Sequence, residues 1–356
     1  MISKIRLRQY RSYLDSTFEL SPGLNIIIGP NASGKTNLLE AVMFICSGTS
    51  FRTTDTELIM HNKNWARLEA LVNGVQRTVS LRNSNNPPKE FAIDNKPYLR
   101  INQTQQIPVV LFEPNHLLML SGSPELRRNY LDNILDYTAA DYKRNRLNYL
   151  KTLKQRNALL KTGQVRKSEL FPWNIRLSHI AGLLIKERLA LADSINSKIN
   201  DIYHTIAKDN KTITVRYKTC VEPEGYESLL LKKLDQSLEL DLLRGFSAYG
   251  PHREDLEVLT NDKLSNQATS RGEARTIVIA LKTIEANTIQ QTSGFSPIIL
   301  LDDVFSELDS SRTKQITHLL NENQTLITTT DKDIGKIQKQ ANIIHTDQIN
   351  SPTNPT

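Results

Sequence analysis

The sequence predicts an α/β fold in which a mainly helical arm is inserted into a mixed unit of strands and helices. Residues 24–28 form a short apolar, β-branched run that leads into a glycine-rich turn and then into a helical pattern over residues 36–46. From about residue 124 the apolar period becomes helical, and from about residue 249 short strand patterns return. A chain of 356 residues is long enough for two folding units.

Each element of the first segment has its own signal. Residues 4–7 alternate between polar and apolar side chains, as a half-buried strand does. Residues 67–72 and 76–81 also alternate, and the Asn73-Gly74 pair between them is a strong hairpin signal. Residues 109–112 are continuously apolar, which predicts a buried strand.

Two long helices are expected in the arm. Ser123 is a candidate N-cap with Pro124 at the first helical position of a preceding helix. An apolar seam that begins near Pro172 predicts a helix of ~35 residues, roughly 50 Å long. The Thr162-Gly163 region joins it to the helix before it, so the two are expected to be antiparallel. Strands are expected at residues 212–218, 297–301 and 325–329.

Composition excludes several classes of protein. The chain has only two cysteines, Cys46 and Cys220, and neither lies in a zinc-ligand pattern, so a disulfide framework is excluded and a cytoplasmic location is expected. The sequence has no signal-peptide pattern and no run of 18 apolar residues, so no membrane span is expected.

A basic stretch stands out within the arm. The net charge is +7, and residues 143–167 hold nine basic and no acidic side chains. Such a block indicates either a nucleic-acid surface or a solvated helix face, and charge alone does not separate the two. The candidate DNA contacts are Lys151, Lys154 and Arg156.

A phosphate-binding motif follows the first buried strand. Residues 29–36, Gly-Pro-Asn-Ala-Ser-Gly-Lys-Thr, match GxxxxGK[ST] between a strand and a helix. Backbone N–H groups of such a loop surround phosphate oxygens, Lys35 would neutralise the β- and γ-phosphates, and the Thr36 hydroxyl would bind Mg²⁺. The alternative is a chance glycine turn with a surface lysine.

Two further motifs complement this loop. The apolar run 298–301 ends in Asp302, the candidate metal ligand, and Asp303, the candidate residue for polarising water. Without the loop, these acids would be interpreted as caps of a following helix. Ser270 and Gly272 precede a helical pattern at residues 276–284 and form either an anion site or a simple serine cap.

Four motifs in this order resemble the bacterial RecF family of SMC-like ABC ATPases. They are GPNASGKTNLLEAVMFICSGTSFRT at 29–53, GSPELRRNYLD at 122–132, YGPHREDL at 249–256 and LLDDVFSELD at 300–309. The resemblance implies an ABC-type P-loop ATPase head formed by residues 1–118 and 245–348, a helical arm at 119–244 and a flexible tail at 349–356.

Site residues follow from the same resemblance. It assigns Mg²⁺ to Thr36 and Asp302, and catalysis to Lys35, Asp302 and Asp303. Ser270 and Gly272 would reach the γ-phosphate held by a second copy, and Asp309 would lie at that junction. Arg11 and Asn37 would lie near the nucleotide. The expected ATP-binding residues of the loop are Gly29, Pro30, Asn31, Ala32, Ser33, Gly34, Lys35, Thr36 and Asn37.

The implied function is an ATP-dependent homodimer that binds duplex DNA and single-strand/double-strand junctions and, with RecR and RecO, places RecA at gaps. Hydrolysis is expected to be slow, with ATP acting as a binding switch, because several residues here depart from the wider ABC ATPase pattern that positions water and the γ-phosphate. Asp303 replaces the usual glutamate, Glu113 the usual glutamine, and Thr328 stands near the missing switch histidine.

Other functions remain open. The alternative is a soluble ABC ATPase subunit that drives a membrane partner; an SMC-type clamp is disfavoured by the short arm, and a P-loop kinase does not explain the later motifs. His252 and Arg253 lie either near the nucleotide or head surface or in structural hydrogen bonds. Arg127 and Arg128 are expected to stabilise helix packing rather than bind DNA.

Overall fold

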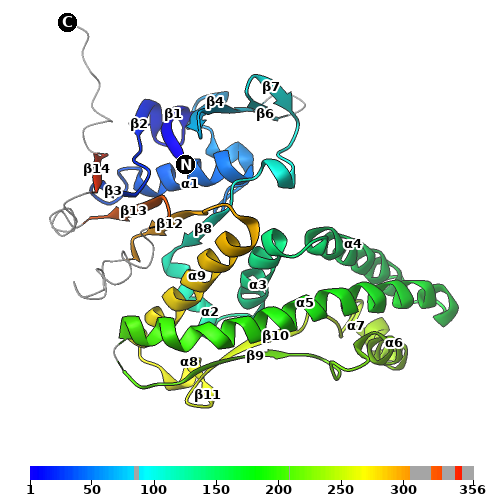
Figure 1. Ribbon diagram of the computed structural model, residues 1–356. Coiled ribbons are helices and arrows are strands. Elements are labelled where there is room, and N and C mark those ends of the chain that lie inside the picture. Colours follow the sequence, from blue (N-terminus) through cyan, green and yellow to red (C-terminus); the bar gives the residue numbers. More distant parts are fainter. Residues whose placement is uncertain (84–87, 208, 305–321, 331–340, 347–356) are drawn as a thin grey trace, which may run out of the picture. The chain divides into compact units, whose positions relative to one another are not determined.

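The computed structural model describes residues 1–83, 88–207, 209–304, 322–330 and 341–346 (Figure 1). The chain forms two compact units, Met1–Pro114 with Ile289–Thr356, and Asn115–Thr288. Residues 245–288 therefore belong with the arm and not, as predicted, with the head. The cause is strand pairing, because β9 of the arm (Ile213–Lys218) pairs along its whole length with β10 (Asp255–Thr260), which lies beyond residue 245. The predicted tail, 349–356, lies outside the described residues.

A five-stranded parallel sheet forms the centre of the first unit. Its order is β14, β3, β13, β12 and β8. The strands span Asn342–His345, Leu24–Ile28, Thr325–Thr329, Ile298–Asp302 and Val109–Phe112. The inner strands are buried along almost their whole length because both faces of such a sheet are covered. Helix α1, Lys35–Ser47, begins directly after the glycine loop and contacts β8, β12 and β13.

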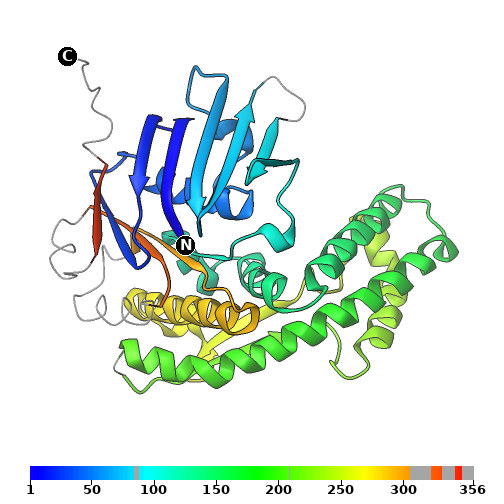
Figure 2. The same cartoon turned by 45° about the horizontal axis from the view of Figure 1, so that its top comes forward.

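An antiparallel sheet of six strands lies on the other side of α1, which also contacts β4 and β5 (Figure 2). The order is β2, β1, β4, β5, β6 and β7, with bounds Tyr13–Glu19, Ile2–Tyr10, Trp65–Val72, Val75–Arg82, Lys89–Ile93 and Lys96–Tyr98. One face carries core residues such as Leu7, Leu68 and Val79, and the other faces solvent. Asn73 and Gly74 both have positive φ, as a type I′ hairpin turn requires.

The second unit consists of helices and a small sheet. Helix α5, Lys167–Ala207, is 41 residues long and contacts α4, Tyr142–Leu160, as the predicted helix pair requires. The three-stranded sheet has the order β11, β10, β9, with bounds Lys263–Leu264, Asp255–Thr260 and Ile213–Lys218. The other helices are α2 (Leu118–Ser121), α3 (Pro124–Thr138), α6 (Tyr226–Gln236), α7 (Leu238–Arg244), α8 (Ser265–Ala268) and α9 (Arg271–Ser293).

Short 3₁₀ turns complete the described elements, at Asp55–Leu58, Gln103–Gln105 and Pro114–Leu117. Across the part of the chain that the structure describes, none of the helices combines the length and the apolar character that a membrane crossing requires.

Candidate functional site

The glycine loop connects β3 to α1 and has the shape of a phosphate cradle. Gly34 has φ +100°, a conformation that favours glycine, and a Cβ there would lie 2.8 Å from the Ser12 Oγ. A Cβ on Gly29 would collide with the Thr346 hydroxyl. The Tyr13 hydroxyl donates to the Gly34 carbonyl at 2.9 Å and holds the end of the loop. Both glycines are thus required by close packing around the turn.

Lys35 is the cation of this loop. Its side chain is buried, and its Nζ donates hydrogen bonds of 2.8 Å to the carbonyls of Gly29 and Pro30. Burial lowers the pKa of Lys35 from its ordinary value, while the carboxylates of Asp303 and Asp302 oppose that change. The ammonium group has no direct ion pair among the described residues, so its charge is available to an anion in the loop.

Thr36 and Asp302 meet at the carboxyl edge of the parallel sheet. The Thr36 hydroxyl donates to both carboxylate oxygens of Asp302, at 2.9 and 3.1 Å. Hydroxyl and carboxylate oxygens are the ligands that Mg²⁺ prefers, and these two come from the loop and from β12. The donor set therefore fits a magnesium ion next to the phosphate cradle.

Thr328 is a site residue that the sequence analysis missed. Its buried hydroxyl donates to Asp302 Oδ1 at 2.8 Å and accepts the backbone N–H of Asp303 at 2.9 Å. Thr328 is the register partner of Asp302 in the neighbouring parallel strand. The only sequence signal was a hydroxyl residue near the end of the strand that neighbours β12 in the sheet. In the sequence this position is notable only because the switch histidine that is usual in ABC ATPases is absent there.

Asp303 follows β12 with φ +50°, a conformation uncommon for residues other than glycine. Strained backbone of this kind concentrates at functional sites, where surrounding contacts hold it in place. The hydrogen bond from the Asp303 N–H to Thr328 is such a contact.

Arg11 and Asn37 lie in the same unit as the loop. Asn37 Nδ2 donates to the Ser12 Oγ at 3.0 Å. Arg11 donates from Nε and Nη2 to the carboxylate of Glu40, at 2.9 and 3.0 Å, and Glu40 is fully buried on α1. Arg11 is therefore tied to the helix that begins at the loop.

The signature residues Ser270 and Gly272 belong to the second unit, at the start of α9. The Ser270 N–H donates to Glu273 Oε2 at 2.9 Å, and the Glu273 N–H donates to the Ser270 Oγ at 3.4 Å, which is a capping box. The hydrogen bond from Lys211 is the main cause that lowers the pKa of Glu273. Both signature residues are exposed. Asp309, the residue expected beside them, lies outside the described residues.

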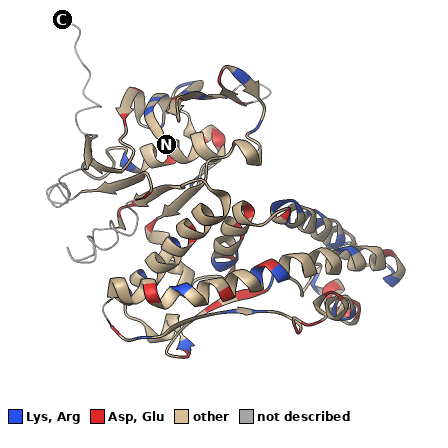
Figure 3. Ribbon diagram, viewed as in Figure 1, with Lys and Arg blue, Asp and Glu red and all other residues tan. Residues whose placement is uncertain are grey.

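One predicted DNA contact is wrong. Arg156 is fully buried, and its Nη1 donates to Asp241 Oδ2 at 2.8 Å and to the Ser247 Oγ at 2.7 Å, while its Nε donates to Asn174. A guanidinium in that position stabilises the contact of α4 with α5 and α7 and does not reach solvent. Lys151 and Lys154 are exposed on the same helix, whose length is rich in basic residues (Figure 3).

The other polar residues singled out in this unit hold its parts together. Arg127 pairs with Asp255 at 2.7 Å, and Arg128 donates to the Glu254 carbonyl, as expected for packing residues. His252 Nε2 lies 3.1 Å from the Ser247 carbonyl, so it carries the proton, and Nδ1 accepts from Tyr149. Burial lowers the pKa of His252 to about 4. Structural hydrogen bonding is thus its observed role.

Arg253 has a different contact. Its guanidinium lies over the ring of Phe246, 4.7 Å from the centroid, in a cation–π arrangement within the second unit.

Comparison with known proteins places these features in a family. Residues 1–351 match the family model described as RecF/RecN/SMC N terminal domain. The chain is 34% identical over 357 residues to a DNA replication and repair protein RecF from Lachnoclostridium phytofermentans, covering 98% of this chain and 97% of the relative. The RecF protein of Streptococcus uberis is also 34% identical, with 93% of each chain covered.

Solved structures agree with the sequence comparison. The structure of the recombination mediator protein RecF-ATP in the RecFOR pathway matches with a TM-score of 0.82 and 28% identity over 93% of this chain and 92% of that chain. An SMC head bound to the C-winged helix domain of ScpA matches with a TM-score of 0.57 at 15% identity, over 96% and 92% of the two chains, which shows the shared ABC-type head fold. With the phosphate loop, the Thr36–Asp302 pair and full-length similarity in one chain, we conclude that it belongs to the RecF family within the RecF/RecN/SMC group.

Proposed function

We propose that this chain is an ATP-dependent DNA-binding protein of DNA replication and repair that acts as a recombination mediator in the cytoplasm. The observation that carries the proposal is the network of Lys35, Thr36, Asp302 and Thr328 at the carboxyl edge of the parallel sheet. Relatives named for DNA replication and repair, and a RecF structure described with ATP, support this reading.

In this proposal the triphosphate occupies the glycine loop. The loop N–H groups and Lys35 bind the β- and γ-phosphates, and Thr36 and Asp302 hold Mg²⁺, which neutralises phosphate charge. Asp303 orients the attacking water. Its side chain is one methylene shorter than glutamate, so water is held less closely and hydrolysis is slow. ATP then acts mainly as a switch.

The switch is a dimer in which each ATP is bound by two copies. Ser270 and Gly272 lie exposed at the N-terminus of α9, whose N–H groups and dipole favour an anion such as the γ-phosphate held by the other copy. The joined copies bind duplex DNA and single-strand/double-strand junctions, with Lys151 and Lys154 contacting the backbone. They assist RecR and RecO in placing RecA at gaps.

Molar mass and DNA binding measured with and without ATP test this proposal. The native chain is expected to dimerise and bind duplex DNA only with ATP. Lys35→Met should lose ATP binding, whereas Ser270→Arg should keep ATP binding and remain monomeric. A native chain that binds ATP but stays monomeric, or that binds DNA equally without ATP, would contradict the proposal.

A further inference from the structure

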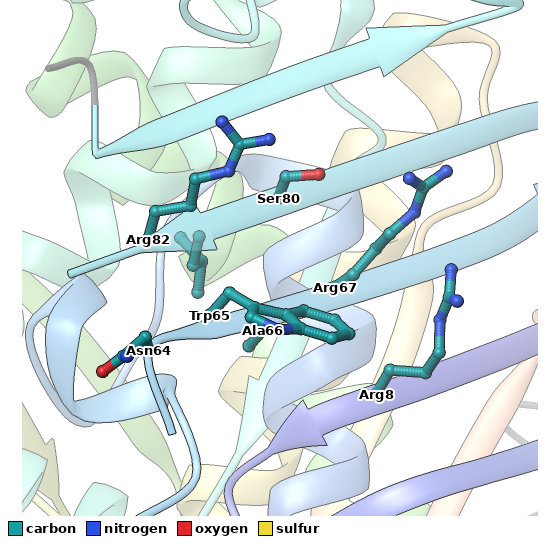
Figure 4. A pocket seen from close by; sticks show the side chains of 8 residues that line it. Arg8, Asn64, Trp65, Ala66, Arg67, Ser80 and Arg82 are labelled. Atoms are coloured by element: carbon teal, nitrogen blue, oxygen red, sulfur yellow. The ribbon is translucent and has the colours of Figure 1, made fainter. Parts of the chain in front are cut away.

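A second basic surface lies on the solvent face of the six-stranded antiparallel sheet. None of the residues that line its pocket belongs to the phosphate loop. There a pocket of about 510 Å³ is lined by residues of β1, β4 and β5 and of the turn before β4 (Figure 4). Its volume is in the range of small-ligand sites, roughly 300–1,000 Å³. The lining is Arg8, Asn64, Trp65, Ala66, Arg67, Ser80, Leu81 and Arg82.

Strand register gathers the charges of this pocket. Arg8 lies directly opposite Arg67, and like charges in that position are unfavourable in a sheet. One carboxylate, Glu69, pairs with both guanidinium groups, each at 2.9 Å. The buried Nε of Arg8 has no hydrogen-bond partner within the described ranges. The arrangement therefore has a surplus of positive charge that a second anion would satisfy.

Arg82 adds a further cation. It lies opposite Trp65 in the strand pairing, and the described residues supply no carboxylate to it. Glu90, opposite Ser80 on β6, is the acidic residue at the far end of this row. Arg8, Arg67 and Arg82 thus outnumber Glu69 and Glu90 on this part of the face, and Asp15, which lies opposite Arg8 on β2, is paired with Arg6 at 2.6 Å.

Trp65 gives the pocket an aromatic surface. Its side chain is 39% exposed, which is unusual for the largest apolar side chain on the polar face of a sheet. In Figure 4 the indole lies flat along the sheet between the arginine side chains, which project outward. In proteins that bind single-stranded nucleic acids, exposed aromatic rings stack on the bases, and neighbouring cations bind the adjoining phosphates.

We propose that this pocket binds one unpaired nucleotide of a DNA strand, with the base stacked on Trp65 and the neighbouring phosphates on Arg67 and Arg82. The inference rests on the proposed DNA-binding function and adds a contact to it. Bases in a duplex are stacked on one another and do not offer a free face to an indole, so the pocket selects single-stranded segments next to a duplex.

The test compares two DNA molecules in the presence of ATP, a blunt duplex and the same duplex with a single-stranded tail. Trp65→Ala should weaken binding of the tailed DNA about tenfold, the usual scale for loss of one stacked base, and leave the blunt duplex within about twofold. Trp65→Phe keeps an aromatic ring and should recover most of the affinity for the tailed DNA. Trp173→Phe, in α5, is the matched tryptophan control and should bind both as the native chain does.

A second measurement does not depend on the alanine variant folding. In Trp173→Phe, Trp65 is the sole tryptophan, and its fluorescence should be quenched by a short oligothymidylate. Equal losses on both DNA molecules in Trp65→Ala, no loss on tailed DNA, or no quenching would overturn the inference while leaving ATP-dependent duplex binding intact. A native chain that binds neither DNA would overturn the proposed function and this inference together.

Discussion

Two arginines of the second unit and three basic residues of the first unit have opposite surroundings. In the second unit Arg156 and Arg188 are buried and are neutralised by Asp241 and Asp132. In the first unit the described residues give Lys35 hydrogen bonds only to backbone carbonyls, and a single carboxylate pairs with both Arg8 and Arg67. A dense basic stretch in a sequence therefore does not locate a binding surface. The carboxylates that the fold places beside it decide which charges stay available.

Removal of a neutralised charge in the second unit should have the largest effect and tests this comparison most directly. Arg156→Gln leaves Asp241 buried with no cation, and the loss of one partner of a buried pair costs about 3–5 kcal/mol of folding stability. Urea unfolding followed by helix content measures this loss. Lys154→Gln, two residues away and exposed, is the matched control and should change stability by less than about 0.5 kcal/mol. A similar small effect for both would show that the Arg156 pair is not structural.

The pH dependence of folding stability tests the burial of a second polar group of this unit, His252. Burial holds the pKa of His252 at about 4, below its ordinary 6.5, so the unfolded state takes up the proton first as pH falls. His252 therefore lowers stability as pH falls from about 6.5 to about 4, by up to ~1.4 kcal/mol per pH unit. His252→Gln should flatten the dependence of the urea midpoint on pH in this window. An unchanged slope would contradict a neutral, buried histidine.

The network in the first unit should respond in function rather than in stability. Thr328→Val removes the hydroxyl that orients Asp302 and Asp303 and keeps the shape of the side chain. ATP hydrolysis is expected to fall roughly 10- to 100-fold, the usual cost of losing a residue that orients a ligand of the metal, with ATP affinity within about twofold. Single-turnover hydrolysis and equilibrium binding separate the two.

Thr328→Ser provides the control for this change because it restores the hydroxyl. Its hydrolysis rate should return to near the native value. If the serine variant is as slow as the valine variant, restoring the hydroxyl does not restore hydrolysis, and the hydrogen bonds of Thr328 do not position the site.

The smallest effect concerns the exposed lysines of the arm. Lys151 and Lys154 changed together to glutamine should weaken duplex binding roughly tenfold and reduce the slope of affinity against salt by about two, independently of DNA sequence. Lys263→Gln, an exposed lysine on β11, is the control. An unchanged salt slope would remove α4 from the DNA surface and leave the sheet face as the remaining basic candidate.

Local signals predicted the parts of the fold whose residues are close in sequence. The strands Leu24–Ile28 and Thr325–Thr329 have the expected bounds because both are short runs rich in β-branched residues. Ser123 and Pro124 mark the start of α3 as expected, although the Ser123 side chain makes no capping hydrogen bond. The phosphate loop is also local, since strand, glycines and helix follow one another.

Features that depend on distant pairing could not be predicted in this way. Arg156 is buried because Asp241, 85 residues away, accepts its hydrogen bond. Thr328 joins the site through its register with Asp302. The second unit extends beyond its predicted boundary because β9 pairs with β10. The pocket around Trp65 forms only when β1, β4 and β5 pair with one another. In each case the deciding partner is set by topology.

A mixture of two inactive variants tests the central claim, that each ATP is bound between two copies. Lys35→Met lacks a working phosphate loop and Ser270→Arg lacks a working signature, so each alone should be inactive in ATP hydrolysis. Mixed in equal amounts, they should recover up to about half of the native rate, because neither variant dimerises with itself and each mixed dimer contains one intact pocket built from both chains. A mixture as inactive as its parts, or a Ser270→Arg variant that hydrolyses ATP normally by itself, would contradict the account.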